Sequence, residues 1–392
     1  MALGENMIAI GDAPPFFRAD PASGHGLTPP ALRGDEAIRC AVRALSGFQK
    51  EALVTSARTG ATWRLVSDEG AYLSGHDAAP CPLGFFTCGM IASYFDEITR
   101  HAAARGVTLR ALRLTQNNVY TMQGSMRQRT MVGGARPIAL DVAVECDLSD
   151  HALRELVETA VAASPVSGLV KGVLPSLFTL THNSTEIATG AATSLGASAH
   201  PEVAAHAPRP APGDLALVER MGLSPEKVVP KGTEAPASSL ADAQDRTLNP
   251  AATAFRREDG LIEIEQVLYS PRGSVFRFLS EEAPMASGPA RAPDALSLLA
   301  AGIGFCFMTQ FGRMAVMEKR ALSHYAVVQD LHVTHGTAGR PGTADPVETH
   351  VHLHMAEGAE VARETLDVAE RTCFLHALCR TDLHTEISLT RL

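Results

Sequence analysis

Two long apolar runs dominate the pattern of hydrophobic and polar positions along this chain. The first covers residues 82–105 and is followed by Gly106, a residue that commonly ends a helix; the second includes residues 298–308. Apolar side chains at nearly every position predict helices that are buried on all sides. The second run carries a cysteine, Cys306, in its middle. We therefore expect two central helices, one of them bearing a buried thiol.

Shorter patterns surround both runs in a similar order. The first run is preceded by a predicted hairpin at 53–66, and it is followed by strand-like segments at 109–126 and 138–146, a helix at 151–163 that Ser149 can cap, and a strand at 177–181. The second run is followed by strands at 325–335 and 347–355, a helix at 359–371 and a strand at 383–389. The elements predict a mixture of helices and antiparallel sheet, an α+β fold.

Two segments lack this regularity. Residues 1–35 are rich in proline and glycine and predict an irregular arm, whereas residues 188–249 are dominated by small residues, proline and polar residues. We interpret the second segment as a linker with a short helix at 215–221. The predicted organisation is an arm (1–35), a first domain (36–187), the linker (188–249) and a second domain (250–392).

The second domain repeats the first. The stretch Ser56-Ala-Arg58 to Arg64 is echoed by Ser270-Pro-Arg272 to Arg277, and the two apolar runs align at a separation of 213 residues, which pairs Ser93 with Cys306. Residues 164–167 align with residues 373–376, so that Ser164 pairs with Cys373. A repeat of this length in one order predicts a tandem duplication. Serine stands in the first copy at both positions where the second copy has cysteine.

Composition and charge exclude several classes of function. The chain of 392 residues is 45% hydrophobic and 20% charged, with a net charge of −9 and no run of basic residues, so we expect a globular protein without affinity for nucleic acid or a membrane surface. It begins without a basic and apolar leader and has no apolar window of membrane-spanning length. Seven cysteines without a CxxC pair favour reduced thiols in the cytoplasm.

The arrangement of the second domain resembles the OsmC and organic hydroperoxide resistance family. Gly302-Ile-Gly-Phe-Cys306-Phe lies in the apolar helix, and Cys373-Phe-Leu-His376 ends a later helix beyond a pair of strands. The resemblance extends over about 40–185 and 255–392. It implies two OsmC-like domains in one chain forming a pseudo-dimer, with sheets wrapped around long central helices and the reactive site between the halves. Further pairing of such chains into homodimers is left open.

The resemblance also implies a chemistry for these residues. Cys306 would attack an organic hydroperoxide as a thiolate, and Cys373 would resolve the resulting sulfenic acid as a disulfide. An arginine in the hairpin turn, Arg58 or Arg272, would stabilise the thiolate. An external dithiol would supply the electrons, and no bound cofactor is expected.

Departures from the family pattern open alternatives. Ser93 and Ser164 leave the first copy with a degenerate site, which Cys88 could also line, so at most one site is a peroxidase. The family's helix begins with Pro-Glu, whereas this chain has Pro82-Leu83 and Ala295-Leu296, with Asp294 the nearest acid in the second copy. These losses, together with His376, favour a cofactor-free hydrolase or lyase in which Cys306 is the nucleophile and a histidine the base. A non-catalytic binding protein is a third interpretation, and it fits the first copy better than the second.

A row of histidines is the remaining candidate for chemistry. His350, His352 and His354 alternate, so they project from one face of a strand, near His332 and His335 on the preceding strand. Three imidazoles with a carboxylate would suit zinc or iron. We interpret the row instead as solvent-facing positions of an amphipathic strand and predict no metal there.

Overall fold

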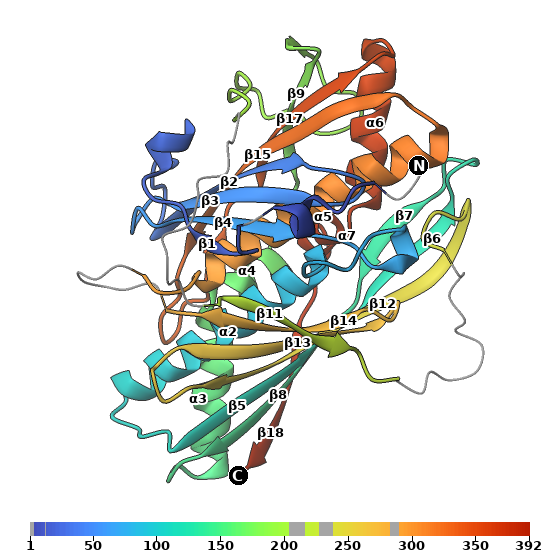
Figure 1. Cartoon of the computed structure of the whole chain (residues 1–392). Coiled ribbons are helices and arrows are strands. Elements are labelled where there is room, and N and C mark those ends of the chain that lie inside the picture. The colour runs from blue at the N-terminus through green and yellow to red at the C-terminus, as the bar shows by residue number, and fades with distance from the viewer. Residues whose placement is uncertain (1–3, 12, 204–215, 227–237, 283–289) are drawn as a thin grey trace.

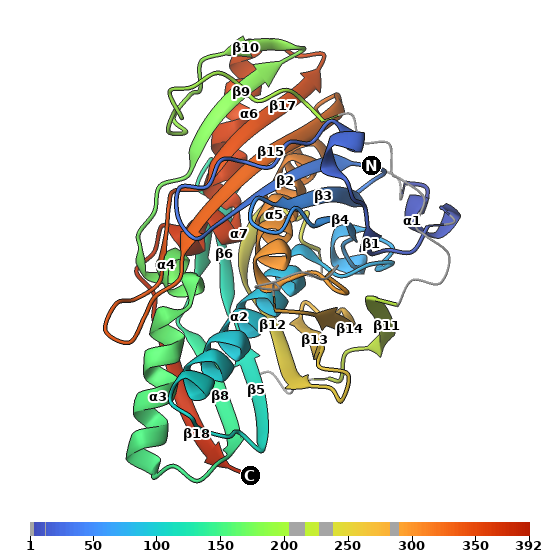
Figure 2. The same ribbon diagram turned by 90° about the vertical axis from the view of Figure 1, so that its left-hand side faces the viewer.

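Two large sheets enclose two long central helices. The structure is a computed structural model that describes residues 4–11, 13–203, 216–226, 238–282 and 290–392. Within these residues the central helices are α2 (Pro82–Ala104) and α5 (Ala295–Glu318), and they pack against each other between the sheets (Figures 1 and 2). The α5 helix is long and apolar enough to cross a membrane, but it is fully buried inside the protein. Its composition therefore suits the core of a globular fold.

Glycines at matching positions allow the central helices to approach closely. A Cβ atom added at Gly302 would lie 2.7 Å from the backbone nitrogen of Phe86, and one at Gly89 would lie 2.7 Å from the carbonyl oxygen of Ala295. Both distances are below van der Waals contact, so neither position has room for a side chain. The two glycines are separated by the same 213 residues that separate Ser93 from Cys306.

The first sheet has the strand order β1-β4-β3-β2-β15-β17-β9-β10, with β16 (Thr343–Ala344) attached to β15. It packs on α5 through β2, β3 and β15. Its strands along the chain are β1 (Phe17–Arg18), β2 (Glu36–Ala44), β3 (Lys50–Ser56), β4 (Thr62–Ser67), β9 (Leu177–His182), β10 (Thr185–Ile187), β15 (Leu322–Thr334) and β17 (Glu348–Met355).

The second sheet has the order β11-β14-β13-β12-β5-β8-β18, with β6 paired to β12 and β7 paired to β6. It packs on α2 through β5, β12 and β13. Its strands are β5 (Ala111–Asn117), β6 (Tyr120–Ser125), β7 (Val132–Ala135), β8 (Ile138–Glu145), β11 (Val218–Leu223), β12 (Ala243–Arg256), β13 (Ile262–Ser270), β14 (Ser274–Ser280) and β18 (Thr385–Arg391).

Each sheet combines strands from both parts of the chain. In the first sheet β2 runs antiparallel to β15, and in the second β12 runs antiparallel to β5. The last strands follow the same plan, because β9 lies parallel to β17 and β18 lies parallel to β8. Hairpin strands from one part of the chain thus extend the sheet formed by strands of the other part.

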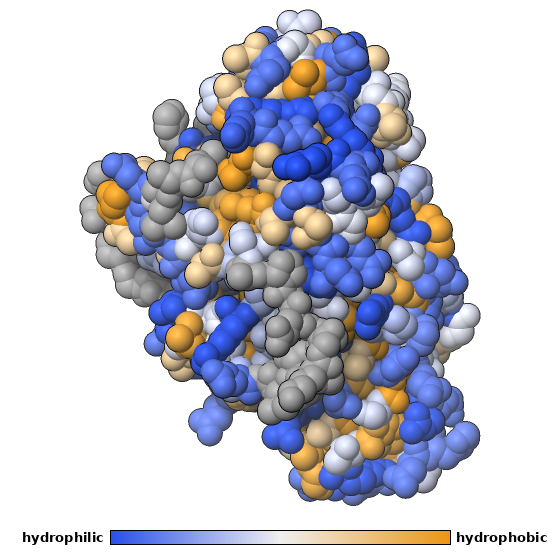
Figure 3. Space-filling view, turned by 90° about the vertical axis from the view of Figure 1, so that its right-hand side faces the viewer, coloured by the Kyte–Doolittle hydropathy of each residue, from blue (hydrophilic) through white to orange (hydrophobic). Residues whose placement is uncertain are grey.

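Further helices flank the central pair. The α3 helix (Asp150–Ala163) packs against α2, and α6 (Ala359–Thr372) packs against α5. Each is followed by a short helix, α4 (Pro165–Lys171) or α7 (Phe374–Cys379). Single turns occur at α1 (Met7–Ile10), η1 (Ala22–His25) and η2 (Ala71–Leu73). Hydrophilic and hydrophobic side chains are interspersed over the face in Figure 3, with hydrophobic ones more frequent towards its lower end.

Most of the predicted elements are confirmed, including the Ser149 cap of α3, whose side chain accepts a hydrogen bond from the Ala152 amide. The predicted helix at 215–221 is wrong, because residues 218–223 form β11. This edge strand pairs with β14, and an irregularity at Gly222 interrupts its register. The strand β12 begins at Ala243, within residues 188–249 of the predicted linker. Residues 204–215 and 227–237 of the predicted linker lie outside the described residues.

Candidate functional site

Two buried thiols from separate helices meet beside α5. Cys306 lies near the middle of α5 and is 2% exposed, whereas Cys373 is fully buried at the junction of α6 and α7. Their sulfur atoms are 3.5 Å apart, with the Cys373 thiol donating to Cys306 Sγ. Both are free thiols. A pair at this distance can form a disulfide after a small movement, because a disulfide brings the two sulfurs to about 2 Å.

The environment separates the roles of the two thiols. Burial raises the pKa of Cys373 well above its ordinary value, and the neighbouring Cys306 raises it further. Backbone amides of His376 and Leu375 act in the opposite direction with smaller effect. Cys373 therefore keeps its proton, and its thiol donates to the Cys306 sulfur.

Three buried cations gather around Cys306. Arg313 lies two helical turns further along α5 and is 1% exposed, Arg246 comes from β12, and Lys50 comes from β3. Burial and the nearby Arg246 lower the pKa of Arg313 to about 9, although Glu69 and a charged Cys306 oppose this. Burial also lowers the pKa of Lys50, again opposed by Glu69 and by Cys306 among others. A thiolate at Cys306 thus has positive charges near it in a region of low dielectric.

A network around the Glu69 carboxylate holds Lys50 in place. Thr309 Oγ1 donates to Glu69 Oε1 at 2.7 Å and accepts from Lys50 Nζ at 2.9 Å. The hydroxyl of Tyr72 donates to the other Glu69 oxygen at 2.7 Å. Glu69 is 4% exposed, so a single buried acid balances part of the positive charge.

Hydrogen bonds to Gln310 and Ser239 hold the two arginines. Arg313 donates to Gln310 Oε1 at 2.8 Å and to the carbonyl oxygen of Ser239 at 3.0 Å. Arg246 donates to the Ser239 hydroxyl, while its Nε has no hydrogen-bond partner among the described residues. The space left beside Cys306 is small, a cavity of about 30 Å³. It is lined by these polar groups and by Leu83, Leu248, Leu268 and Phe374, among others.

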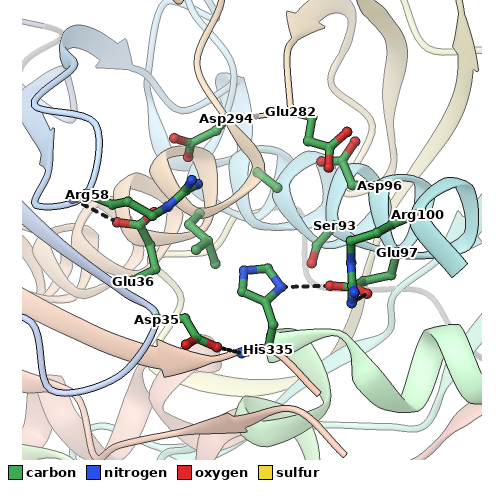
Figure 4. Close-up of a pocket in the computed structure, with 12 residues that line it drawn as sticks. Asp35, Glu36, Arg58, Ser93, Asp96, Glu97, Arg100, Glu282, Asp294 and His335 are labelled. Carbon is green, nitrogen blue, oxygen red and sulfur yellow. Dashed lines mark hydrogen bonds and ion pairs between the residues drawn. The ribbon is translucent and has the colours of Figure 1, made fainter. Parts of the chain in front are cut away.

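The serine pair forms a second site on α2. Ser93 and Ser164 are both buried, with hydroxyl oxygens 2.8 Å apart. They align with Cys306 and Cys373 in the predicted repeat. Beside Ser93 lies a cavity of about 380 Å³ that is shown in Figure 4. The serine site is thus the roomier of the two.

The two predicted hairpin arginines do not line the cavity beside Cys306. Arg58 lines the cavity beside Ser93, where its Nε donates to Glu36 Oε2 at 2.5 Å (Figure 4). Arg272 lies at an exposed turn and donates to the carbonyl oxygen of Ser224 and to Glu226. The expectation that one of them supports Cys306 therefore needs correction, and the groups beside this thiol are Arg246, Arg313 and Lys50. Of these, Arg313 could have been found in the sequence, since residues seven apart share one face of a helix.

His376 lies in a purely apolar setting. Its ring packs edge-on against Phe307 at 4.6 Å and against Phe178 at 5.7 Å. Burial lowers its pKa to about 3, and neither ring nitrogen has a hydrogen-bond partner among the described residues. A base must reach the proton it removes and bind it near working pH. The predicted role of His376 as a base for Cys306 is therefore contradicted.

Cys88 does not line the serine site as predicted. It lies in the core of α2, and burial raises its pKa well above the ordinary value. The cavity beside Ser93 is lined by other residues of α2, namely Asp96, Glu97 and Arg100. Cys88 is thus a packing residue in the described structure.

Two of the three histidines in the row are buried and His354 is half-buried, which contradicts the prediction of solvent-facing positions. His350 and His352 are 6% and 4% exposed, because residues 200–203 lie over this face of the sheet. His350 Nδ1 lies 2.9 Å from Thr179 Oγ1, and His354 lies 3.1 Å from Glu202. His350 thus contacts Thr179, whereas His354 shares the Glu202 carboxylate with His324 of β15.

One cluster of potential metal ligands occurs among the described residues, at Asp330, His332 and Glu348. The Asp330 carboxylate already accepts two hydrogen bonds of 2.7 Å from Arg39, and Glu348 is paired with Arg33. His332 is buried and its ring nitrogens have no partner in this part of the chain. A cation there would compete with two arginines, so we assign no metal to this cluster.

Comparisons with known proteins concern mainly the second part of the chain. A family model described as OsmC-like protein matches residues 288–388, which include both Cys306 and Cys373. Among solved structures, the chain is similar to the crystal structure of an OsmC-like hydroperoxide resistance protein from Jannaschia sp. CCS1, with 22% identity over 30% of this chain and 75% of that chain, and a TM-score of 0.18. No curated protein matches the chain. Residues 288–388 are therefore similar to the OsmC-like family.

Proposed function

We propose that this protein reduces organic hydroperoxides at the Cys306–Cys373 pair. The observation that carries the proposal is the 3.5 Å contact between two buried sulfurs with Lys50, Arg246 and Arg313 around them. A thiolate needs neighbouring cations, and a two-cysteine cycle needs a second thiol within reach. The OsmC-like family match over these residues agrees with a peroxide-related activity.

The proposed cycle has three steps. The Cys306 thiolate attacks the distal oxygen of ROOH, the O–O bond breaks, and an alkoxide leaves and is protonated to ROH while Cys306 becomes a sulfenic acid. Cys373 sulfur then attacks the sulfenic sulfur, which releases water and forms the Cys306–Cys373 disulfide. An external dithiol reduces this disulfide by exchange and is itself oxidised to a disulfide. No resident cofactor is needed, because the thiols carry both electrons.

We infer further that the chain is a tandem duplication folded as a pseudo-dimer. Support comes from the strand pairing, in which β2 joins β15 just as β12 joins β5, and β9 joins β17 just as β18 joins β8. The matched glycines Gly89 and Gly302 at the helix contact add to it. On this reading the serine site and the thiol site are equivalent positions of an ancestral dimer.

The alternative is a hydrolase or lyase in which Cys306 is a covalent nucleophile. That chemistry needs a base that cycles protons near neutral pH. His376 has an apolar environment and a pKa of about 3, so it does not support the alternative. The peroxidase needs no such histidine, because neighbouring cations can stabilise the thiolate that it uses.

The test is to treat reduced protein with cumene hydroperoxide without a reductant and to follow peroxide loss and disulfide formation by mass spectrometry. Wild type is expected to consume about one peroxide per chain and to form the Cys306–Cys373 disulfide. Cys306→Ser should consume none, whereas Cys373→Ser should stop at a sulfenic acid that dimedone traps. Cys146→Ser removes a thiol elsewhere and should behave as wild type. A wild type that consumes no peroxide contradicts the proposal.

A further inference from the structure

A buried lysine lies one hydroxyl group away from the cavity beside Cys306. Lys50 is 1% exposed, and its strand, β3, packs on α5 (Figure 1). Its Nζ donates to Thr309 Oγ1 at 2.9 Å and to the carbonyl oxygen of Phe48 at 2.6 Å. Lysine is almost never buried this completely unless its charge is paired or used. The position of Lys50 therefore calls for a role.

Thr309 connects this lysine with the reacting sulfur. It follows Cys306 by three residues on α5, so the two side chains share one face of the helix, and both line the same cavity. The Thr309 hydroxyl accepts from Lys50 and donates to Glu69, whereas Lys50 Nζ lies 3.9 Å from the Glu69 carboxylate. A hydroxyl can accept one proton while it gives up another, and its hydrogen can rotate towards a new acceptor. Thr309 can therefore pass a proton between Lys50 and the cavity.

The two arginines beside Cys306 have different hydrogen-bond partners. Arg313 donates to the side-chain oxygen of Gln310 and to the carbonyl oxygen of Ser239, and such oxygens have no proton to pass on. Arg246 donates to the Ser239 hydroxyl, but Ser239 is not among the residues that line the cavity. Of these three cations, Lys50 is thus the one that donates to a hydroxyl facing the reacting sulfur.

The environment of Lys50 favours release of its proton. Burial lowers the pKa of its ammonium group, although the charges of Glu69, Asp68 and Cys306 act against this. An ammonium group with a lowered pKa is a better acid than a lysine in water, and the neutral amine that remains is a base near the working pH. Lys50 can therefore both give and take a proton.

The proposed peroxidase cycle needs a source and a sink for one proton. The leaving alkoxide must be protonated, and Cys306 must lose its proton again after the disulfide is reduced. We propose that Lys50 carries this proton and exchanges it with the cavity through the Thr309 hydroxyl. This inference rests on the proposed reduction of organic hydroperoxides at Cys306.

The protons balance over the cycle. When the Cys306 thiolate attacks, the distal oxygen keeps its hydrogen and becomes the sulfenic acid, and the O–O bond breaks. The alkoxide takes the Thr309 hydroxyl proton, and Thr309 takes a proton from the Lys50 ammonium, which leaves an amine. Cys373 then forms the disulfide and releases water. After the external dithiol has reduced the disulfide, the Cys306 thiol returns its proton to the Lys50 amine through Thr309, which restores the thiolate and the ammonium.

The test compares two peroxides that differ in their need for a proton. Cumene hydroperoxide releases a strongly basic alkoxide, whereas peracetic acid releases a carboxylate that stays ionised at neutral pH. The rate of peroxide loss is measured with the full-length protein, and Cys306→Ser is the blank. Lys50→Met should slow cumene hydroperoxide about 100-fold more than peracetic acid, because loss of the charge slows both reactions and loss of the proton slows only the first.

Three further variants separate the proton from the charge. Thr309→Val keeps the shape of the side chain without the hydroxyl, so it should also slow cumene hydroperoxide more than peracetic acid, by about tenfold or more. It serves if Lys50→Met fails to fold. Thr309→Ser keeps the hydroxyl and should keep the wild-type ratio of the two rates. Arg313→Gln removes a cation that does not contact Thr309 and should slow both peroxides by the same factor.

The ratio of the two rates decides the outcome. Equal slowing of both peroxides in Lys50→Met or in Thr309→Val would overturn the proton role and leave the peroxidase standing. A wild type that consumes neither peroxide would contradict the peroxidase itself, and this inference with it.

Discussion

The Cys306 pocket and the Ser93 pocket lie beside positions of α5 and α2 that align in the sequence, and they differ in volume and in charge. The Cys306 pocket is small and is lined by two buried cations, Arg246 and Arg313, and one buried acid, Glu69. The Ser93 pocket is open enough for a ligand and is strongly acidic. Each keeps a glutamate and an arginine at equivalent positions, Glu69 with Arg313 and Glu282 with Arg100.

The difference shows that the fold brings two hydroxyl or two thiol groups into contact, whereas their reactivity depends on the surrounding side chains. Both pairs are in contact, the sulfurs at 3.5 Å and the hydroxyl oxygens at 2.8 Å. What surrounds them decides whether an ionised thiol would be stable there. Arg313 is buried beside Cys306, whereas the side chain of Arg100 is 43% exposed.

The largest expected effect comes from placing a pair of thiols in the Ser93 pocket. Ser93→Cys with Ser164→Cys, in a Cys306→Ser background, should react with cumene hydroperoxide ~1,000-fold more slowly than wild type, because acidic neighbours disfavour a thiolate there. Diamide should still oxidise the new pair to a disulfide, given the 2.8 Å contact between the serine hydroxyls. Rapid peroxide consumption by this variant would show that the surrounding charges are unimportant.

The next effect tests the buried arginine. Arg313→Gln should slow peroxide consumption by ~100-fold and shift alkylation of Cys306 by iodoacetamide to higher pH, because a thiolate loses a nearby cation. Arg100→Gln is the matched control at the equivalent position of α2 and should leave both measurements unchanged. Equal effects of the two substitutions would remove the distinction between the pockets.

The close contact of the central helices predicts a stability effect that is the same on both sides. Gly302→Val and Gly89→Val should each lower the free energy of unfolding by about 2 kcal/mol, because a side chain would overlap backbone atoms of the other helix. Urea denaturation measures this. Gly24→Ala, where an added Cβ meets nothing within 4 Å, should cost much less. A large asymmetry between the two valine variants would argue against the matched helix contact.

The smallest expected effect is a pH dependence of stability caused by His376. Ser167, which aligns with it in the first half of the chain, has no group that titrates in this range. The ordinary pKa of histidine is 6.5, and burial lowers that of His376 to about 3. Below pH 6.5 this histidine is therefore protonated in the unfolded chain but stays neutral in the folded chain. The free energy of unfolding consequently falls as the pH drops from 6.5 towards 3. His376→Leu should reduce this slope by up to about 1.4 kcal/mol per pH unit and leave it unchanged above pH 6.5.

Urea denaturation at several pH values checks this slope, and the same variant tests the alternative function. Peroxide consumption at neutral pH should survive the His376→Leu substitution, because the ring does not serve Cys306. Loss of activity in a folded variant would revive the hydrolase interpretation. An unchanged slope would contradict the burial of a neutral imidazole in the native state.

Local sequence determined the elements and their order. The apolar runs located α2 and α5, Ser149 marked the start of α3, and the repeat aligned Ser93 with Cys306 and Ser164 with Cys373. These features depend on periodicity and spacing within one segment, which a chain carries regardless of its fold. The prediction for residues 215–221 failed because β11 is held by its pairing with β14, a contact with a distant strand.

Only the tertiary structure decided which charges stand beside each pair. Lys50, Glu69 and Arg246 come from three separate parts of the chain to meet Arg313 and Cys306, while Arg58 joins the acids around Ser93 instead. Cavity volume and burial likewise arise where elements from both halves pack together. The physical reason is that electrostatic interaction depends on distance through space and on exclusion of water, neither of which follows from separation along the sequence.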